Sequence, residues 1–347
     1  MVGGHCWLGH RGDGALGNHR PLSLGIVGLG WIGSRYVAAA ERLPADVAIA
    51  GLVDENPDVL RQYASTNRLL GSYQAMADSA SLDGVVICTP PASHREVAEF
   101  FLDRRVSVLC EKPFALTVPS AESMSNHASA AGVFVAVATK YRCLEEVARA
   151  RDLVMSGKLG DVISFELVFT SKNDMRGRWH TNCDISGGGV FVDNGSHAVD
   201  VAQYLFGRVQ DIMVVEYPRT QGLSVEDTAQ AILRTASGVV GSSFVSWSID
   251  RANDFYLSVH GTTGDVRVGW DRSEYRLAPA QEWTAFGERY DVVHALANQL
   301  SNFSGALRGT ASPVSSADDA VNDVAAIVAG CRSIQTHSWE TTRSAHG

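Results

Sequence analysis

The sequence predicts two domains: an α/β domain with a doubly wound parallel sheet, then an α+β domain with a mainly antiparallel sheet. Three observations support this prediction. Short apolar runs alternate with helical stretches up to residue 138, a glycine-rich turn follows the first run, and strand-like runs joined by short turns fill much of the remainder. The length of 347 residues also fits about two domains.

The parallel strands expected in the first domain are short apolar runs, which are typical of strands buried on both faces. They lie at residues 22–28, 47–53, 84–89, 106–110 and 133–138. The helices between them are expected near residues 34–42, 57–67, 93–104 and 119–131. We place this domain at residues 21–142, after a flexible tail at residues 1–20 that lacks the apolar stretch of a signal peptide.

The second domain is expected at residues 143–340, where short turns connect consecutive strands. The expected strands are residues 162–170, 211–217, 228–235, 239–247, 255–260 and 265–268. The expected helices are residues 144–156, 190–206, 288–308 and 316–332.

Composition excludes several classes of protein. The chain is 45% hydrophobic and 19% charged, as expected for a packed soluble protein. Its net charge of −9 lacks the basic footprint of a nucleic-acid binder. No apolar run approaches the roughly 18 residues of a membrane span, so no membrane partner is expected. The six cysteines form no CxxC pair, so we expect no metal site and a reducing, cytoplasmic location.

A glycine-rich turn with the sequence GxGxxG follows the first strand and opens a helix. Gly28 allows a tight turn, Gly30 lets a pyrophosphate approach the backbone, and Gly33 lets helix and strand pack closely. Asp54 closes the next strand, where its carboxylate would accept hydrogen bonds from ribose hydroxyls. Asp54 and Glu55 would repel a 2′-phosphate, so the pattern predicts a Rossmann domain that binds NAD rather than NADP.

A second group of residues suggests chemistry on an alcohol. Asp193 and His197 are spaced i, i+4 on an expected helix and so share one face. Removal of a hydride from a secondary alcohol requires a base for the hydroxyl proton, and histidine suits that role. Lys112 follows a parallel strand on the carboxyl side, where an ammonium could stabilise alkoxide character. Asp193 could hold the hydroxyl and keep Lys112 charged. The alternative is a structural histidine and a surface lysine.

Several motifs together resemble one family. They are Gly28–Gly33, Asp54, Thr89-Pro90-Pro91 with His94, Glu111-Lys112-Pro113, Gly157–Gly160, and Gly187-Gly188-Gly189 followed by Asp193, His197 and Asp200. In this order they resemble the glucose–fructose oxidoreductase / inositol dehydrogenase / MocA (Gfo/Idh/MocA) family over residues 22–335. The resemblance implies NAD(P)-dependent chemistry on sugar-like alcohols and a second domain whose large open sheet mediates oligomers, a homodimer or a homotetramer.

The resemblance also assigns roles to residues. The implied catalytic set is Lys112, Asp193 and His197, with His197 as the general base. The expected cofactor contacts are Gly28, Gly30, Trp31, Ile32, Gly33, Asp54, Thr89, Pro90, His94, Glu111 and Lys112. The expected substrate contacts are Lys140, Arg142, Trp179, Asp193 and His197. Trp179 could stack on a sugar ring or belong to a surface loop, and Asp200 is expected to stabilise its helix.

The sequence therefore predicts an NAD-dependent dehydrogenase that oxidises a secondary ring hydroxyl of a sugar, aminosugar or cyclitol to a ketone. The acidic net charge favours a cationic ligand such as an aminosugar. The Arg-rich, Lys-poor composition is typical of a GC-rich bacterium, and together the two observations suggest aminoglycoside or aminosugar antibiotic biosynthesis. One alternative is a nucleotide-sugar or sugar-phosphate dehydrogenase, for which Arg142, Arg176 and Arg178 could form an anion site. Another is a non-catalytic NAD-binding regulatory protein, which the presence of Lys112 and His197 disfavours.

Overall fold

The computed structural model describes residues 20–64, 69–280 and 282–342. The tail expected at residues 1–20 therefore lies, except for Arg20, outside the described residues. No helix in the described ranges is long and apolar enough to cross a membrane.

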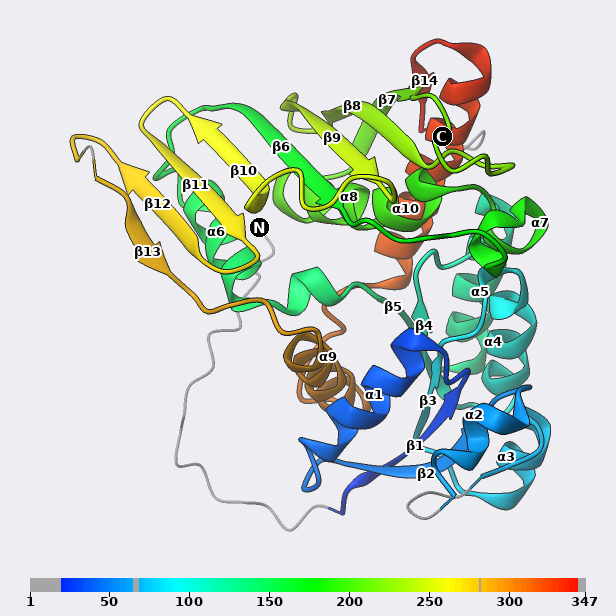
Figure 1. The fold of residues 1–347 in the computed structure, drawn as a ribbon. Coiled ribbons are helices and arrows are strands. Elements are labelled where there is room, and N and C mark those ends of the chain that lie inside the picture. The colour runs from blue at the N-terminus through cyan, green and yellow to red at the C-terminus, as the bar shows by residue number, and fades with distance from the viewer. Residues whose placement is uncertain (1–19, 65–68, 281, 343–347) are drawn as a thin grey trace.

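The first domain contains a five-stranded parallel sheet with the order β2-β1-β3-β4-β5, which confirms the predicted α/β fold (Figure 1). The strands are β1 (Leu22–Val27), β2 (Val47–Val53), β3 (Gly84–Ile87), β4 (Ser107–Glu111) and β5 (Val135–Ala138). The helices that follow them are α1 (Trp31–Glu41), α2 (Pro57–Arg61), α3 (Tyr73–Ser79), α4 (His94–Leu102) and α5 (Val118–Ala131). The strand order reverses between β1 and β3, and in open α/β sheets ligands bind at such a switch point.

Helix α3 was not expected from the sequence. It contributes one buried residue, Met76, and its N-cap is Ser72, whose hydroxyl accepts a hydrogen bond from Ala75 N. A seven-residue helix with a single buried side chain has too little apolar periodicity to detect in the sequence.

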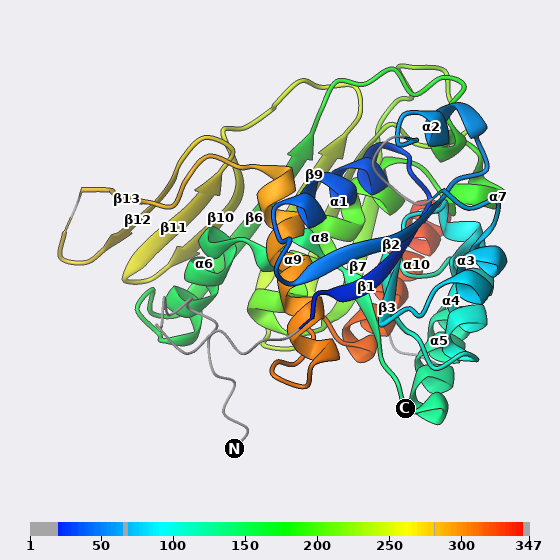
Figure 2. The ribbon, with the colours of Figure 1, turned by 90° about the horizontal axis from the view of Figure 1, so that it is seen from below.

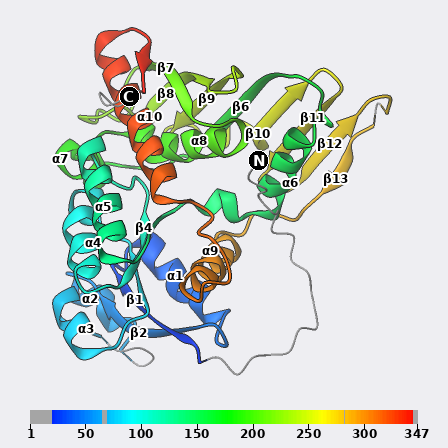
Figure 3. The same ribbon diagram turned by 180° about the vertical axis from the view of Figure 1, so that it is seen from behind.

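Both faces of the parallel sheet are covered partly by the C-terminal part of the chain. Helix α9 (Val292–Leu307) packs beside α1 on one face, where Leu300 and Phe303 join the same core as Ile26 (Figure 1). Helix α10 (Ala317–Thr336) packs against α5 on the other face and crosses toward the second sheet (Figure 3). The sequence analysis assigns both helices to the second domain at residues 143–340, yet their apolar side chains complete the core of the first.

The second sheet has nine strands in the order β13-β12-β11-β10-β6-β9-β8-β7-β14, and the predicted mainly antiparallel pairing is confirmed. The pair β6–β9 is parallel and the other pairs are antiparallel. Its strands are β6 (Val162–Thr170), β7 (Val209–Glu216), β8 (Thr228–Thr235), β9 (Val240–Ser246), β10 (Phe255–Gly261), β11 (Gly264–Gly269), β12 (Ser273–Leu277), β13 (Thr284–Phe286) and β14 (Glu340–Thr341).

Helices α6 (Glu145–Met155) and α8 (Val190–Phe206) cover the face of this sheet that is turned toward the first domain (Figures 1 and 2). Fourteen of the 17 residues of α8 are buried, because the helix lies between the nine-stranded sheet, α6 and α10. A short helix, α7 (Cys183–Ser186), precedes it. The central position of α8 brings its polar residues to the boundary between the two sheets.

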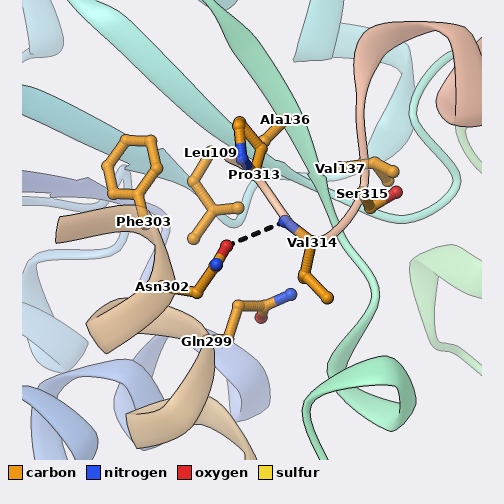
Figure 4. Close-up of a pocket in the computed structure, with 9 residues that line it drawn as sticks. All are labelled: Leu109, Ala136, Val137, Gln299, Asn302, Phe303, Pro313, Val314 and Ser315. Carbon is orange, nitrogen blue, oxygen red and sulfur yellow. Dashed lines mark hydrogen bonds between the residues drawn. The ribbon is translucent and has the colours of Figure 1, made fainter. Parts of the chain in front are cut away.

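A small cavity of about 10 Å³ lies between α9 and the last two strands of the parallel sheet (Figure 4). Asn302 and Gln299 line it from α9, and the Asn302 side-chain oxygen accepts a hydrogen bond from Val314 N at 2.8 Å. This volume suits about one water molecule. The cavity is a packing feature of the helix–sheet junction, and Lys112, Asp193 and His197 are not among the residues that line it.

Candidate active site

The glycine-rich turn after β1, Gly28–Gly33, is called the phosphate turn below. It needs its first and third glycines for steric reasons. Gly28 has a φ of +89°, and a Cβ on it would lie 2.7 Å from the carbonyl carbon of Cys88. A Cβ on Gly33 would lie 1.9 Å from the carbonyl oxygen of Gly28. A Cβ on Gly30, in contrast, would meet no atom within 4 Å. The turn is therefore closely packed on its inner side and open at Gly30.

The residues around this turn fit a dinucleotide. The first N–H to bond within α1 is that of Ser34, so the N–H groups of Trp31, Ile32 and Gly33 remain available to a phosphate. Trp31 is 62% exposed, and the guanidinium carbon of Arg35 lies 4.9 Å from its ring centroid. No acidic side chain lies in the first turn of α1 to oppose an anion.

Asp54 lies beside the turn, as the sequence predicts. Its Oδ2 accepts a hydrogen bond from Leu29 N at 2.6 Å, and its Oδ1 accepts one from Asn56 N at 2.8 Å. A carboxylate has about four acceptor sites, so both oxygens keep capacity for ribose hydroxyls. Asp54 thus joins the ends of β1 and β2 and can still bind a ligand.

The loops after β3 and β4 are joined by His94. Its ring is fully buried, with Nε2 2.8 Å from the carbonyl oxygen of Thr89 and Nδ1 3.1 Å from that of Pro113. Burial lowers the pKa of His94 below its usual value. Each ring nitrogen faces a backbone carbonyl, and the neutral ring donates to one of the two, so His94 positions the loop that contains Thr89 and Pro90 and does not face a cofactor.

Lys112 and Asp193 form an ion pair between the two domains. Lys112 follows β4, and its ammonium donates to the carboxylate Oδ1 of Asp193 and, at 3.1 Å, to the carbonyl oxygen of the same residue. The indole N–H of Trp247 donates to Asp193 Oδ2 at 3.2 Å. Lys112 lowers the pKa of Asp193 against the opposing effect of burial, so the carboxylate stays ionised.

Glu111 fixes the backbone of Lys112 by a hydrogen bond. Its carboxylate is buried and accepts hydrogen bonds from Lys112 N at 3.1 Å and from the Tyr36 hydroxyl at 3.3 Å. Burial raises the pKa of Glu111, while the neighbouring lysines oppose that shift. This contact makes Glu111 a support for the Lys112 backbone.

His197 lies one turn after Asp193 on α8, with Lys140 against it. Lys140 Nζ is 2.8 Å from His197 Nε2, and both side chains are buried. Burial and the nearby charge of Lys112 lower the pKa of Lys140 to about 7. Burial, Lys140 and Lys112 lower the pKa of His197 well below its usual value. Lys112 and His197 line a common cavity of about 10 Å³.

Family comparison supports this geometry. Residues 22–139 match the model described as an oxidoreductase family with an NAD-binding Rossmann fold, and residues 147–267 match the Gfo/Idh/MocA C-terminal domain. The two matches together span more than two thirds of the chain. The chain belongs to the Gfo/Idh/MocA family of oxidoreductases.

Named members of the Gfo/Idh/MocA family resemble this chain along most of its length. The levoglucosan dehydrogenase of Pseudarthrobacter phenanthrenivorans is 24% identical over 294 residues, 73% of this chain and 75% of the relative. The inositol 2-dehydrogenase of Mycolicibacterium gilvum is 26% identical and covers 78% of this chain and 80% of its own. A solved levoglucosan dehydrogenase in complex with NADH shares the fold, with a TM-score of 0.85, 20% identity and coverage of 93% and 100%.

Arg142 was expected to contact the substrate, but it lies in a buried cluster of charged residues between α8 and α10. Its side chain is 3% exposed, with Nε 2.7 Å from Asp200 Oδ1 and Nη1 3.3 Å from Asp319 Oδ1. Burial acts to lower the pKa of Arg142, but the carboxylates of Asp200, Asp319 and Asp323 outweigh it and raise the pKa. The guanidinium thus stabilises the junction of α8 and α10, and no hydrogen bond connects it to Lys112 or Asp193 in the described chain.

Trp179, also expected at the substrate, stacks on His180. The two rings are 3.7 Å apart at 19°, and Trp179 is 39% exposed. The His180 ring is 6.5 Å from that of Trp247, the partner of Asp193, and Nδ1 of His180 is buried without a hydrogen-bond partner among the described residues. The sequence assigns no role to His180, and no local pattern indicates its position beside the ion pair.

The glycine triplet before α8 serves packing. A Cβ on Gly189 would lie 2.0 Å from the carbonyl oxygen of Glu226. The Glu226 carboxylate accepts hydrogen bonds from Gly189 N and Phe191 N, so it occupies the N-terminus of α8. The triplet therefore allows the backbone of Glu226 to approach the start of α8 closely.

Proposed function

We propose that this oxidoreductase oxidises a secondary ring hydroxyl of a sugar, aminosugar or cyclitol to a ketone with NAD. One observation carries the proposal: the ion pair of Lys112 and Asp193 lies at the carboxyl edge of the parallel sheet, with His197 one helical turn away. In open α/β sheets the ligand binds at this edge. A cation, a carboxylate and an imidazole together can polarise and deprotonate an alcohol.

Each residue has a distinct task in this mechanism. Lys112 would donate a hydrogen bond to the reacting oxygen and stabilise its alkoxide character. Asp193, oriented by Trp247, forms the ion pair with Lys112 and can accept a hydrogen bond from the substrate. His197 is neutral because its pKa is lowered, so its ring can accept the hydroxyl proton. NAD, when bound, takes the hydride.

The choice of NAD over NADP depends on Asp54. Its carboxylate and that of Glu55 lie at the end of β2, where an adenosine ribose would be held beside a Rossmann turn. A 2′-phosphate there would face two negative charges. Asp54→Ala is expected to weaken NAD binding and to reduce the preference for NAD over NADP, as measured by the Kd of each.

The substrate class is supported by the relatives and by charge. Levoglucosan and inositol, which appear in the names of relatives, are cyclic compounds with secondary ring hydroxyls. The net charge of −9 favours a cationic aminosugar within this class, as in aminosugar antibiotic biosynthesis. A nucleotide sugar or sugar phosphate is less favoured, because Arg142 and Arg176, two of the candidate anion ligands, pair with carboxylates.

The test is NADH formation, followed at 340 nm, with a panel of inositols, neutral sugars, aminosugars and aminoglycosides. Lys112→Met and His197→Asn should each lower kcat at least about 100-fold, as expected for loss of an electrostatic or acid–base group. Lys158→Met, at an exposed turn, is the matched control and should retain wild-type kcat. Full turnover in either active-site variant contradicts the assigned roles, and NAD binding without oxidation of any alcohol favours a regulatory protein.

We also propose that residues 21–142 and 143–340 form the cofactor and substrate domains, and that the chain forms a homodimer or homotetramer through the nine-stranded sheet. Exposed apolar side chains, namely Ile163 of β6, Val215 of β7 and Tyr217 directly after β7, support an interface there. Light scattering of Ile163→Asp should show a smaller species than wild type if this sheet holds the oligomer. An unchanged mass would place the interface elsewhere.

A further inference from the structure

Lys140 contacts His197, and the mechanism above does not require this contact. Lys140 opens a short 3₁₀ turn (Lys140–Cys143) after β5, and His197 is in the middle of α8. Their nitrogens are 2.8 Å apart in a buried position. A lysine does not need to contact the general base for that base to accept a proton, so the contact needs its own explanation.

The protonation states that this contact allows are limited. A charged Lys140 must donate to Nε2, which then carries a lone pair, so the ring proton is on Nδ1. A neutral Lys140 can accept from Nε2–H, and Nδ1 then carries the lone pair. Two cations at this distance in a buried site would repel each other strongly. The charge of Lys140 therefore selects the tautomer of His197.

We propose that Lys140 is the terminal acceptor of the proton that His197 removes from the substrate hydroxyl. This inference rests on the proposed function. The substrate O–H bond breaks as Nδ1–H forms, and Nε2–H breaks as Nζ–H forms, so the amine becomes an ammonium and the imidazole stays neutral. The electron pair of the substrate C–H bond leaves as hydride to NAD. Because Lys140 acts only through His197, it is a positioning residue.

The surroundings favour this transfer. The charged and titratable groups facing the pair are Glu111 at the end of β4, Lys112 after it, Asp193 and Asp200 of α8, and Tyr141 of the 3₁₀ turn. Tyr290, before α9, stacks on Tyr141 rather than on the pair. Burial and Lys112 destabilise the ammonium of Lys140 more than the carboxylates stabilise it, so its pKa falls to about 7. An uncharged amine is thus available near neutral pH, where an ordinary lysine would be charged.

The imidazole is also held in place for a transfer at two nitrogens. The Tyr141 ring meets the His197 ring edge-on at 5.0 Å and 74°, and Lys140 Nζ lies 4.8 Å from the centroid of the same tyrosine. Nε2 is directed at Lys140, which leaves Nδ1 as the nitrogen for the substrate. Lys112 and His197 also line a common cavity of about 10 Å³, which places the two residues next to each other.

The first experiment measures the tautomer of His197 without any cofactor or turnover. Protein labelled with ¹⁵N-histidine is titrated from pH 5 to pH 9 by NMR, with His197 assigned by the signals lost in His197→Gln. We expect the proton to be on Nδ1 at low pH and on Nε2 at high pH, with a midpoint near 7, the value to which the pKa of Lys140 is lowered. In Lys140→Met this exchange should be absent.

The second experiment measures the pH profile of kcat/KM for alcohol oxidation. Wild-type activity should rise with pH through a midpoint near 7, as Lys140 loses its proton. Lys140→Arg keeps a cation on Nε2 at every pH, so kcat/KM should fall at least about 100-fold and not recover up to pH 9. In Lys140→Met, kcat/KM should no longer rise with pH near 7. Lys158→Arg, at an exposed lysine, is the control and should keep the wild-type profile.

The outcomes separate this inference from the proposed function. A single His197 tautomer from pH 5 to pH 9, or a wild-type limb in Lys140→Met, overturns the role of Lys140 even if alcohols are oxidised normally. A tautomer exchange that depends on Lys140, with no alcohol oxidised, overturns the proposed function and with it the transfer from substrate. The NMR titration of the wild-type protein needs no Lys140 variant, so a Lys140 variant that fails to fold does not prevent this test.

Discussion

Gly33→Ala tests whether packing within the phosphate turn, rather than the cofactor, requires the third glycine. The new Cβ would lie 1.9 Å from the Gly28 carbonyl oxygen and 2.9 Å from its carbon. Both are backbone atoms, and Gly28 already adopts a φ of +89°, so neither can move without displacing the turn. Overpacking of this kind costs about 1–3 kcal/mol. We expect the free energy of unfolding to fall by that amount in protein without NAD.

Gly30→Ala is the matched control in the same turn. Its Cβ meets no protein atom within 4 Å, so the only cost to folding is a poorer N-cap for α1, about 1 kcal/mol or less. The same Cβ would enter the space through which a pyrophosphate approaches the backbone. We therefore expect Gly30→Ala to fold nearly as stably as wild type but to bind NAD at least about tenfold more weakly, a loss of about 1.4 kcal/mol.

Urea unfolding with circular dichroism gives the stability, and titration of NADH fluorescence gives the Kd. The two variants should separate stability from cofactor affinity. Gly33→Ala should mainly lower the free energy of unfolding, and Gly30→Ala should mainly weaken NADH binding. The reasoning is refuted if Gly33→Ala unfolds within about 0.5 kcal/mol of wild type, a difference typical of a surface substitution. It is also refuted if Gly30→Ala binds NADH with unchanged affinity.

Three further predictions concern buried polar groups. Trp247→Phe removes the N–H that orients Asp193, so steady-state kinetics should show a roughly tenfold lower kcat with little change in NADH affinity. Arg142→Met leaves buried Asp200 without its cation and should lower the free energy of unfolding by about 3–5 kcal/mol in urea. Burial in the folded state lowers the pKa of His94 below 6.5. The contribution of neutral His94 to the free energy of unfolding should therefore be fully present above pH 6.5 and should decrease as the pH falls, by up to about 1.4 kcal/mol per pH unit. His94→Asn should remove that slope, and an unchanged slope would contradict it.

The sequence predicted the five parallel strands and six of the nine strands of the second sheet, because these strands have strong local signals, but it did not predict β12, β13 or β14. The five parallel strands are short apolar runs such as β4 (Ser107–Glu111), in which all five residues are buried. Long amphipathic or buried helices such as α8 (Val190–Phe206) were also found close to their observed ends. Short elements with few buried residues, such as β13 (Thr284–Phe286), were not, because three partly exposed residues have no detectable period.

The candidate site was only partly predictable, because its contacts join residues far apart in the sequence. The motif around Lys112 and the spacing of Asp193 and His197 are local patterns, and the structure brings these residues together. The Trp247 indole reaches Asp193 across 54 residues, and Lys140 reaches His197 across 57. No local rule predicts such partners; they follow from the docking of α8 against both sheets.

The position of α9 has a consequence for how the chain is made. A ribosome releases the strands of the parallel sheet well before Leu300 and Phe303, which cover one face of that sheet and follow β5 by more than 160 residues. N-terminal domains generally fold first during translation. Here the nascent first domain would expose apolar surface until α9 arrives, so it depends on the last part of the chain to finish folding.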